Sequence, residues 1–142
     1  MKSLMDYIGE AKQEIKEVSL EEGRDLVEKG VKILDVREPG EYLSGAISGA
    51  INVPRGILEP AADFNYPGAN PELRDGRDEE WLIVCRSGGR AALATKTLKE
   101  MGFNNVSNLL GGMDAWQSQG FPMVAPSDEN MTITLKEPCR ID

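Results

Sequence analysis

The stretch from Trp81 to Arg90, which reads W-L-I-V-C-R-S-G-G-R, constrains the fold of this chain more than any other. Its first four residues form a continuous apolar run, the pattern of a short strand buried on both faces of a sheet. The glycine pair at 88–89 ends the strand, and residues 90–101 carry helix formers with apolar residues on one face, followed by Gly102 at the C′ position. Cys85 therefore follows the carboxyl end of a strand and precedes a helix, the place where open α/β sheets bind their ligands.

The loop after Cys85 combines three features that favour an anion. A helix N-terminus presents unpaired N–H groups and a partial positive charge. Gly88 and Gly89 allow the backbone to turn its amides toward an anion, and Arg86 and Arg90 add full positive charges. Such surroundings favour the thiolate form of a cysteine. A buried cysteine that merely ends a strand is the simpler alternative, but this sequence favours a reactive or anion-binding Cys85.

The chain has no histidine and only two cysteines, Cys85 and Cys139. It therefore lacks the residues for cysteine–histidine or serine–histidine–aspartate catalysis and for histidine-ligated metals. Two cysteines at this spacing match no zinc pattern. We expect neither a metal nor a cofactor, and a nucleophilic Cys85 would have to be activated by backbone amides and arginines.

The composition limits the possible partners and location of the chain. Its 142 residues suffice for one domain with its own core. A net charge of −8 without a basic stripe argues against nucleic acid as a partner. No apolar run approaches the ~20 residues of a membrane helix, and the first residues lack the apolar core of a signal peptide. We therefore expect a cytoplasmic protein that binds neither nucleic acid nor membrane.

Strands and helices alternate along the chain. Residues 1–17 have the pattern of an amphipathic helix, and Ser19 and Glu22 form a capping box for a helix that ends at Gly30. Segment 60–80 is rich in Pro, Gly, Asn, Asp and Glu, and we expect a short helix or a functional flap there. Further strands are expected at 31–37, 49–54, 105–110 and, as an edge strand, 131–135, and short helices at 41–44, 55–59 and 113–118. This alternation predicts a three-layer α/β domain with a parallel sheet.

Three motifs, taken in order, resemble those of rhodanese domains. The first comprises D-V-R-E at 35–38, Glu41-Tyr42 and G-A-I-S-G-A-I-N-V-P at 45–54; the second is C-R-S-G-G-R at 85–90; the third is Gly111-Gly112, Trp116 and G-F-P at 120–122. The resemblance implies a three-layer α/β/α domain over residues 19–123 with a central parallel sheet of about five strands. An amphipathic helix at 1–18 would precede it, and a tail at 124–142 with a possible edge strand would follow.

The resemblance also implies an activity. In rhodanese domains the cysteine that matches Cys85 takes a sulfane sulfur from a donor such as thiosulfate or a persulfide, holds it as a persulfide and passes it to a thiophilic acceptor. The acceptor here would be cyanide, a small thiol or a protein. Thiolate attack on sulfur is similar to thiol–disulfide exchange and needs no strong base, which agrees with the absence of histidine.

The same resemblance assigns roles around Cys85. The backbone amides of the loop would hold the sulfur, and its two arginines would stabilise the anion; this anion-binding loop consists of Arg86, Ser87, Gly88, Gly89 and Arg90. Asp35 and Arg37 match positions that mostly brace the loop through hydrogen bonds and charge pairs. Where the family commonly has Gly-His-Ile, this chain has Gly45-Ala46-Ile47, and that histidine is usually structural.

Two other functions stay open. The cell-cycle dual-specificity phosphatases share the rhodanese fold, but cysteine phosphatases place five residues between cysteine and arginine, whereas four lie between Cys85 and Arg90. The shorter loop suits a single sulfur better than a phosphoryl group. The second alternative is a non-catalytic module that only binds a partner, although such modules usually lack the loop cysteine. Cys139 is more simply a free thiol than a resolving cysteine.

Overall fold

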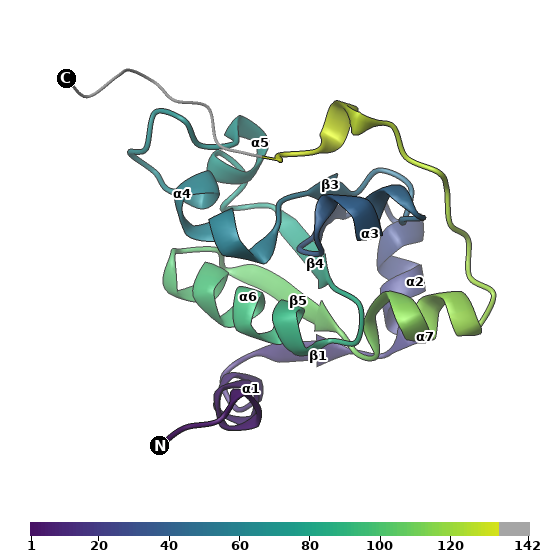
Figure 1. The fold of residues 1–142 in the computed structure, drawn as a ribbon, viewed down its shortest axis with the longest axis horizontal. Helices are drawn as coiled ribbons and strands as arrows, with labels where there is room; N and C mark the ends of the chain where they lie inside the picture. The colour runs from purple at the N-terminus through teal and green to yellow at the C-terminus, as the bar shows by residue number, and fades with distance from the viewer. Residues whose placement is uncertain (134–142) are drawn as a thin grey trace.

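The computed structural model describes residues 1–133 of the chain (Figure 1). Its strands are β1 (Lys16–Val18), β2 (Lys32–Asp35), β3 (Ile51–Asn52), β4 (Glu80–Val84) and β5 (Asn105–Leu109). Its helices are α1 (Leu4–Lys12), α2 (Leu20–Glu28), α3 (Pro39–Leu43), α4 (Leu58–Ala62), α5 (Pro71–Arg74), α6 (Gly89–Glu100) and α7 (Gly112–Ser118), with 3-10 turns η1 (Arg55–Ile57) and η2 (Asp128–Asn130).

The strands form one parallel sheet in the order β1-β5-β4-β2-β3. The most apolar strand, β4, lies at the centre of the sheet, where it is covered on both faces. Trp81, Ile83 and Cys85 contribute to one hydrophobic core, and Leu82 and Val84 contribute to the other. This alternation is the period of a strand that is covered on both sides.

Helices cover each face of the sheet (Figure 1). The first core contains apolar residues of α4, α5 and α6, and the second contains residues of α2, α3 and α7. The prediction of an α/β fold with a parallel five-stranded sheet is confirmed. Cys85 lies directly after the central strand, between the β4 carboxyl end and the first residue of α6.

The N-terminal segment differs from the sequence prediction. A helix is predicted through residue 17, but α1 ends at Lys12, and residues 16–18 form β1, which pairs with β5 from Lys16↔Ser107 to Val18↔Leu109. The helical prediction is therefore wrong at its C-terminal end. A strand of three residues is too short to show an alternating pattern, and its hydrogen bonds come from a partner that is distant in sequence.

Segment 60–80 contains a short helix, as expected, and is held closely to the domain. Besides the end of α4 it includes α5, which begins after the N-cap Asn70. The Arg77 guanidinium donates hydrogen bonds to the carbonyl oxygens of Ala62 at 2.7 Å, Arg74 at 2.6 Å and Met101 at 2.9 Å. The bonds to Ala62 and Arg74 hold the segment together, and the bond to Met101 ties it to the end of α6.

The expected edge strand at 131–135 lies partly outside the described residues. Within them, Met131 forms a parallel bridge with Asn52 of β3, and the Thr132 N–H donates to the Asn52 carbonyl at 2.8 Å. A strand over the whole of 131–135 stays a prediction, and Cys139 also lies outside the described residues. None of the helices within residues 1–133 has the length and apolar character needed to cross a membrane.

Two glycines within helices give opposite predictions for the same substitution. A Cβ on Gly23 of α2 would overlap Leu109 Cδ1. A Cβ on Gly9 of α1 would have no heavy atom of residues 1–133 within 4 Å apart from its chain neighbours and the backbone of its own helix. We expect Gly23→Ala to lower the free energy of unfolding by about 1–2 kcal/mol, because overpacking outweighs the gain in helix propensity. Gly9→Ala should raise it by up to about 1 kcal/mol. Urea denaturation measures both, and destabilisation by both would contradict the packing explanation.

Candidate active site

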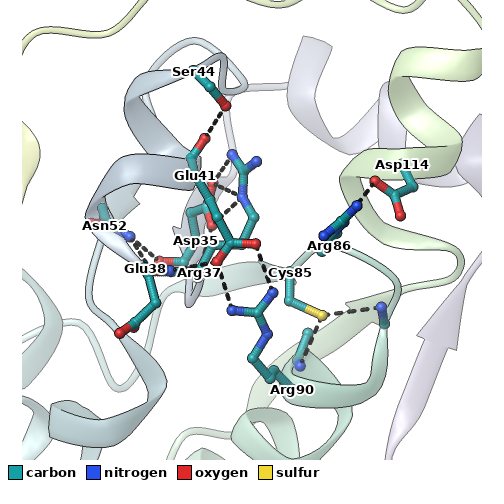
Figure 2. Close-up of polar contacts among 12 residues, drawn as sticks. Asp35, Arg37, Glu38, Glu41, Ser44, Asn52, Cys85, Arg86, Arg90 and Asp114 are labelled. Carbon is teal, nitrogen blue, oxygen red and sulfur yellow. Dashed lines mark hydrogen bonds and ion pairs between the residues drawn. The ribbon is translucent and has the colours of Figure 1, made fainter.

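The Cys85 side chain is enclosed by the loop that follows it. The residue is buried, and its Sγ atom accepts hydrogen bonds from the backbone N–H of Gly88 at 3.0 Å and of Ala91 at 3.3 Å (Figure 2). Gly88 has a φ of +108°, which favours glycine because a side chain is strained there. Ala91 is the third residue of α6, so its N–H has no acceptor within the helix.

Other donors of the loop face no acceptor. Within residues 1–133 the backbone N–H groups of Arg86, Ser87, Gly89 and Arg90 make no hydrogen bond. Two of them belong to the first turn of α6, where the helix dipole adds a partial positive charge. The loop therefore offers N–H donors to an anionic group bound at the cysteine.

The Gly111-Gly112 motif fixes the loop from its other side. The N–H groups of Met113 and Asp114 in α7 donate to the carbonyl oxygens of Cys85 at 2.7 Å and Arg86 at 2.9 Å. A Cβ on Gly112 would lie 2.5 Å from the Cys85 oxygen and 2.7 Å from the Arg86 oxygen. Only a glycine at this position lets α7 approach closely enough to hold the loop through its carbonyl groups.

A second contact holds the loop from β5. The Asn108 side-chain amide donates to the Gly88 carbonyl at 3.3 Å and to the Glu17 carboxylate of β1 at 2.9 Å. Asn108 is fully buried; these hydrogen bonds replace the contacts of its amide nitrogen with water, whereas its Oδ1 atom has no partner within residues 1–133. The missed strand β1 thus contributes, through Glu17, to the support of the glycine that contacts the sulfur.

Arg90 is paired with a carboxylate that the sequence analysis does not include among the site residues. Its Nη1 and Nη2 atoms donate to Glu41 Oε1 at 2.8 Å and Oε2 at 2.9 Å. The Glu38 backbone N–H also donates to Glu41 Oε1 at 3.0 Å. The hydrogen bonds from Arg90 lower the pKa of Glu41 from 4.5 to about 2 and, in return, raise the pKa of Arg90. The two-pronged geometry makes this a strong ion pair.

Arg86 is also directed at a carboxylate. Its Nε atom lies 3.5 Å from Asp114 Oδ1, and both side chains are largely exposed. Figure 2 shows the Arg86 and Arg90 guanidinium groups against Asp114 and Glu41. Both arginines predicted to stabilise an anion are thus present beside the loop, but each already has an anionic partner.

Asp35 and Arg37 form a buried pair on the neighbouring strand. Arg37 Nη2 donates to Asp35 Oδ2 at 2.7 Å and to the Gly45 carbonyl at 2.8 Å. The Asn52 amide donates to the backbone oxygens of both residues, at 3.0 Å for Asp35 and 2.8 Å for Arg37. Within the described residues neither side chain makes a hydrogen bond or ion pair with loop 85–90. They fix the ends of the segment that carries Glu41, and Glu41 in turn holds Arg90.

Sequence reasoning thus misses three contributors to the site. Ala91 follows the predicted loop, and the geometry of a helix N-terminus would have indicated that its N–H points back to the sulfur. Glu41 belongs to a recognised motif but lies 49 residues from Arg90. Asn108 is an ordinary polar residue in a strand, and only the sheet order brings it beneath Gly88.

The close contacts of Gly112 predict that a methyl group added at this position lowers the stability of the fold. Gly112 has a φ of +59°, so Gly112→Ala adds backbone strain to the clash with two carbonyl groups. We expect the free energy of unfolding to fall by about 2–4 kcal/mol. Gly120→Ala is the control, because Gly120 has a φ of +73° with open space around it, and strain alone should cost about 1 kcal/mol. Equal losses in urea denaturation would refute the role of the clash.

The Glu41–Arg90 pair predicts a pH-dependent contribution to stability. Because the folded-state pKa of Glu41 lies below 4.5, the pair stabilises the fold at higher pH and loses this contribution as pH falls from 4.5 toward 2. Near pH 7, Glu41→Gln should lower the free energy of unfolding by about 1–2 kcal/mol, reduced from the full shift by partial exposure. The difference from wild type should shrink in acid. A constant difference would exclude the ion pair as its cause.

A control separates this pair from an ordinary surface ion pair. Glu59 lies 2.9 Å from Arg55 one helical turn away, and about half of its side chain is exposed. Glu59→Gln should therefore change the free energy of unfolding by less than about 0.5 kcal/mol. Urea denaturation of Glu41→Gln and Glu59→Gln over the same pH series compares their effects on the free energy of unfolding.

Comparison with known proteins places this geometry in a family. The family model described as "Rhodanese-like domain" matches residues 19–119. Thiosulfate sulfurtransferase 16 of Arabidopsis thaliana is 34% identical over 110 residues, which cover 76% of this chain and 92% of the relative.

Solved structures agree with this match. One is a Rhodopseudomonas palustris protein of unknown function that is described as a possible tyrosine phosphatase. It superposes with a TM-score of 0.82 at 31% sequence identity, and the match covers 87% of this chain and 96% of that protein. The human single-domain sulfurtransferase gives a TM-score of 0.64 at 30% identity, with 72% and 96% covered. The chain belongs to the rhodanese-like domain family.

Proposed function

We propose that this protein is a sulfurtransferase in which Cys85 carries the transferred sulfur as a persulfide. The observation that carries the proposal is the pair of hydrogen bonds from Gly88 and Ala91 to the Cys85 sulfur at the N-terminus of α6. Backbone N–H groups stabilise negative charge on sulfur. Relatives named as sulfurtransferases, such as the plant and human proteins, support sulfur transfer in general.

The proposed reaction has two balanced steps. The Cys85 thiolate attacks the outer sulfur of a donor such as thiosulfate, the donor S–S bond breaks, and sulfite leaves with the bonding electron pair. A thiophilic acceptor, such as cyanide or a thiolate, then attacks the outer sulfur of the persulfide, and the electron pair returns to Cys85. Neither step needs a proton relay, because in each an anionic nucleophile attacks sulfur and an anionic leaving group departs, as in thiol–disulfide exchange.

The unoccupied N–H donors suit the persulfide state. A persulfide adds one sulfur atom beyond Cys85 Sγ, and that atom carries the negative charge. The N–H groups of Arg86, Ser87, Gly89 and Arg90 have no acceptor within residues 1–133 and belong to the same loop. We infer that they hold the outer sulfur, while Gly88 and Ala91 hold the inner one.

The description of the Rhodopseudomonas palustris structure as a possible tyrosine phosphatase suggests an alternative chemistry. The geometry of this site disfavours it. A cysteine phosphatase would need its loop arginine to grip a phosphoryl group. Both terminal nitrogens of Arg90 are bound to Glu41, and the loop between Cys85 and Arg90 has only four residues. We expect no hydrolysis of p-nitrophenyl phosphate, and turnover that depends on Cys85 would overturn this choice.

Mass spectrometry of the intact protein tests the proposal directly. After incubation with thiosulfate or polysulfide, the wild type should gain the mass of one sulfur atom, and cyanide should remove it as thiocyanate. Cys85→Ser should gain nothing, because the nucleophile is lost. Cys139→Ser is the matched control and should load like the wild type. A wild type that gains no sulfur from either donor would point instead to a module that binds a partner without catalysis.

A further inference from the structure

Each arginine side chain around Cys85 lies beside a carboxylate. Arg90 is bound at both terminal nitrogens by Glu41, and Arg86 lies 3.5 Å from Asp114. Arg37, the third arginine in Figure 2, is committed to Asp35 in a buried pair. Each arginine near the cysteine therefore has a carboxylate of its own.

One more carboxylate makes the net charge of the side chains around Cys85 negative. Glu38 is exposed at the start of α3, near enough to Arg90 for its charge to act on that arginine. The charges of the three arginine pairs cancel, and Glu38 leaves this group with one negative charge; its members are Arg37, Arg86, Arg90, Asp35, Glu38, Glu41 and Asp114. A Cys85 thiolate adds a second negative charge.

This balance bears on the choice of sulfur donor. Thiosulfate is a dianion, and one of its charges lies on the sulfonate end that departs as sulfite. To neutralise that end, Arg90 would have to leave Glu41, or Arg86 would have to share its charge between the donor and Asp114. Displacing Glu41 breaks two hydrogen bonds of 2.8 and 2.9 Å, and the freed carboxylate would repel the incoming dianion. The backbone N–H groups of the loop can still stabilise one negative charge on sulfur.

We propose that the Glu41–Arg90 and Arg86–Asp114 pairs make this site select sulfur donors with a single negative charge, such as alkyl persulfides and thiosulfonates, over dianionic thiosulfate. This inference rests on the proposed sulfur-transfer function and narrows its donor class. With an alkyl persulfide, the Cys85 thiolate attacks the outer sulfur, the S–S bond breaks, and the alkyl thiolate leaves with the electron pair. Charge and atoms balance as they do with thiosulfate.

Two donors of nearly equal shape isolate the effect of charge. Methanethiosulfonate differs from thiosulfate in having a methyl group in place of one sulfonate oxygen, so it carries one negative charge fewer. In a two-step transfer, kcat/KM for the donor reports only loading of the cysteine. The measured quantity is kcat/KM for thiosulfate divided by kcat/KM for methanethiosulfonate, which we call the donor ratio.

Ionic strength gives the first test on the wild-type protein. Salt screens repulsion between a negative site and a dianion more than repulsion of a monoanion. Raising the ionic strength from ~0.01 M to ~0.3 M should therefore increase the donor ratio about threefold. A ratio that falls with salt would mean that the site attracts dianions, and this would overturn the inference.

Removing single carboxylates gives the second test. Glu41→Gln and Asp114→Asn should each raise the donor ratio about threefold to tenfold at low salt, because each frees an arginine beside the cysteine. The control is Glu14→Gln, which alters the net charge equally. Glu14 pairs with Lys96 at 3.5 Å, toward the other end of α6. Its donor ratio should stay within about 1.5-fold of wild type.

The outcomes separate this inference from the proposed function. If both donors load Cys85 and neither site variant differs from Glu14→Gln, only the inference is overturned. If neither donor adds sulfur to Cys85, the sulfur-transfer function is overturned and the inference with it. Asp114→Asn keeps the test decisive if Glu41→Gln fails to fold, because the Asp114 side chain is largely exposed and its replacement should not disturb the fold.

Discussion

The hydrogen bonds from Gly88 and Ala91 to the Cys85 sulfur are the interaction on which the arrangement of this site depends. They require a left-handed backbone at Gly88 and a helix that begins at Gly89. They also require the β4 strand to end at the same level, so that the cysteine side chain points into the turn. The neighbouring strands and α7 then serve to keep this short loop in one conformation.

Within residues 1–133 the Cys85 sulfur accepts hydrogen bonds from backbone N–H groups and none from an arginine side chain. Backbone N–H groups carry only partial charges, and a fold can direct several of them at one atom without attracting counter-ions. The arginines face carboxylates instead: two hydrogen bonds hold Arg90 to Glu41, and Arg86 lies beside Asp114. Arg90 therefore also has a positional role, because its pair with Glu41 ties α6 to α3. A cysteine loop rich in arginine is thus no proof of a cationic site.

The parts of this structure that sequence could predict are those specified by neighbouring residues. The apolar run of β4, the glycine pair after it and the amphipathic α6 fixed the position of Cys85 correctly, since each signal is local. The strand β1 could not be found, because three residues show no period and their pairing with β5 is tertiary. The pairing of Arg90 with Glu41 could not be predicted either, since Glu41 is distant in sequence and caps its own helix.

The three motifs of the sequence are physically connected, and this explains why they occur together. The first supplies Glu41, whose position is set by the buried Asp35–Arg37 pair, and it reaches the loop through Arg90. The third supplies Gly112, which lets α7 donate hydrogen bonds to the carbonyl groups of Cys85 and Arg86. Both converge on the second motif, one holding its helical end and the other its strand end. A change in any of the three should therefore alter the same loop, and through it the N–H groups around the sulfur.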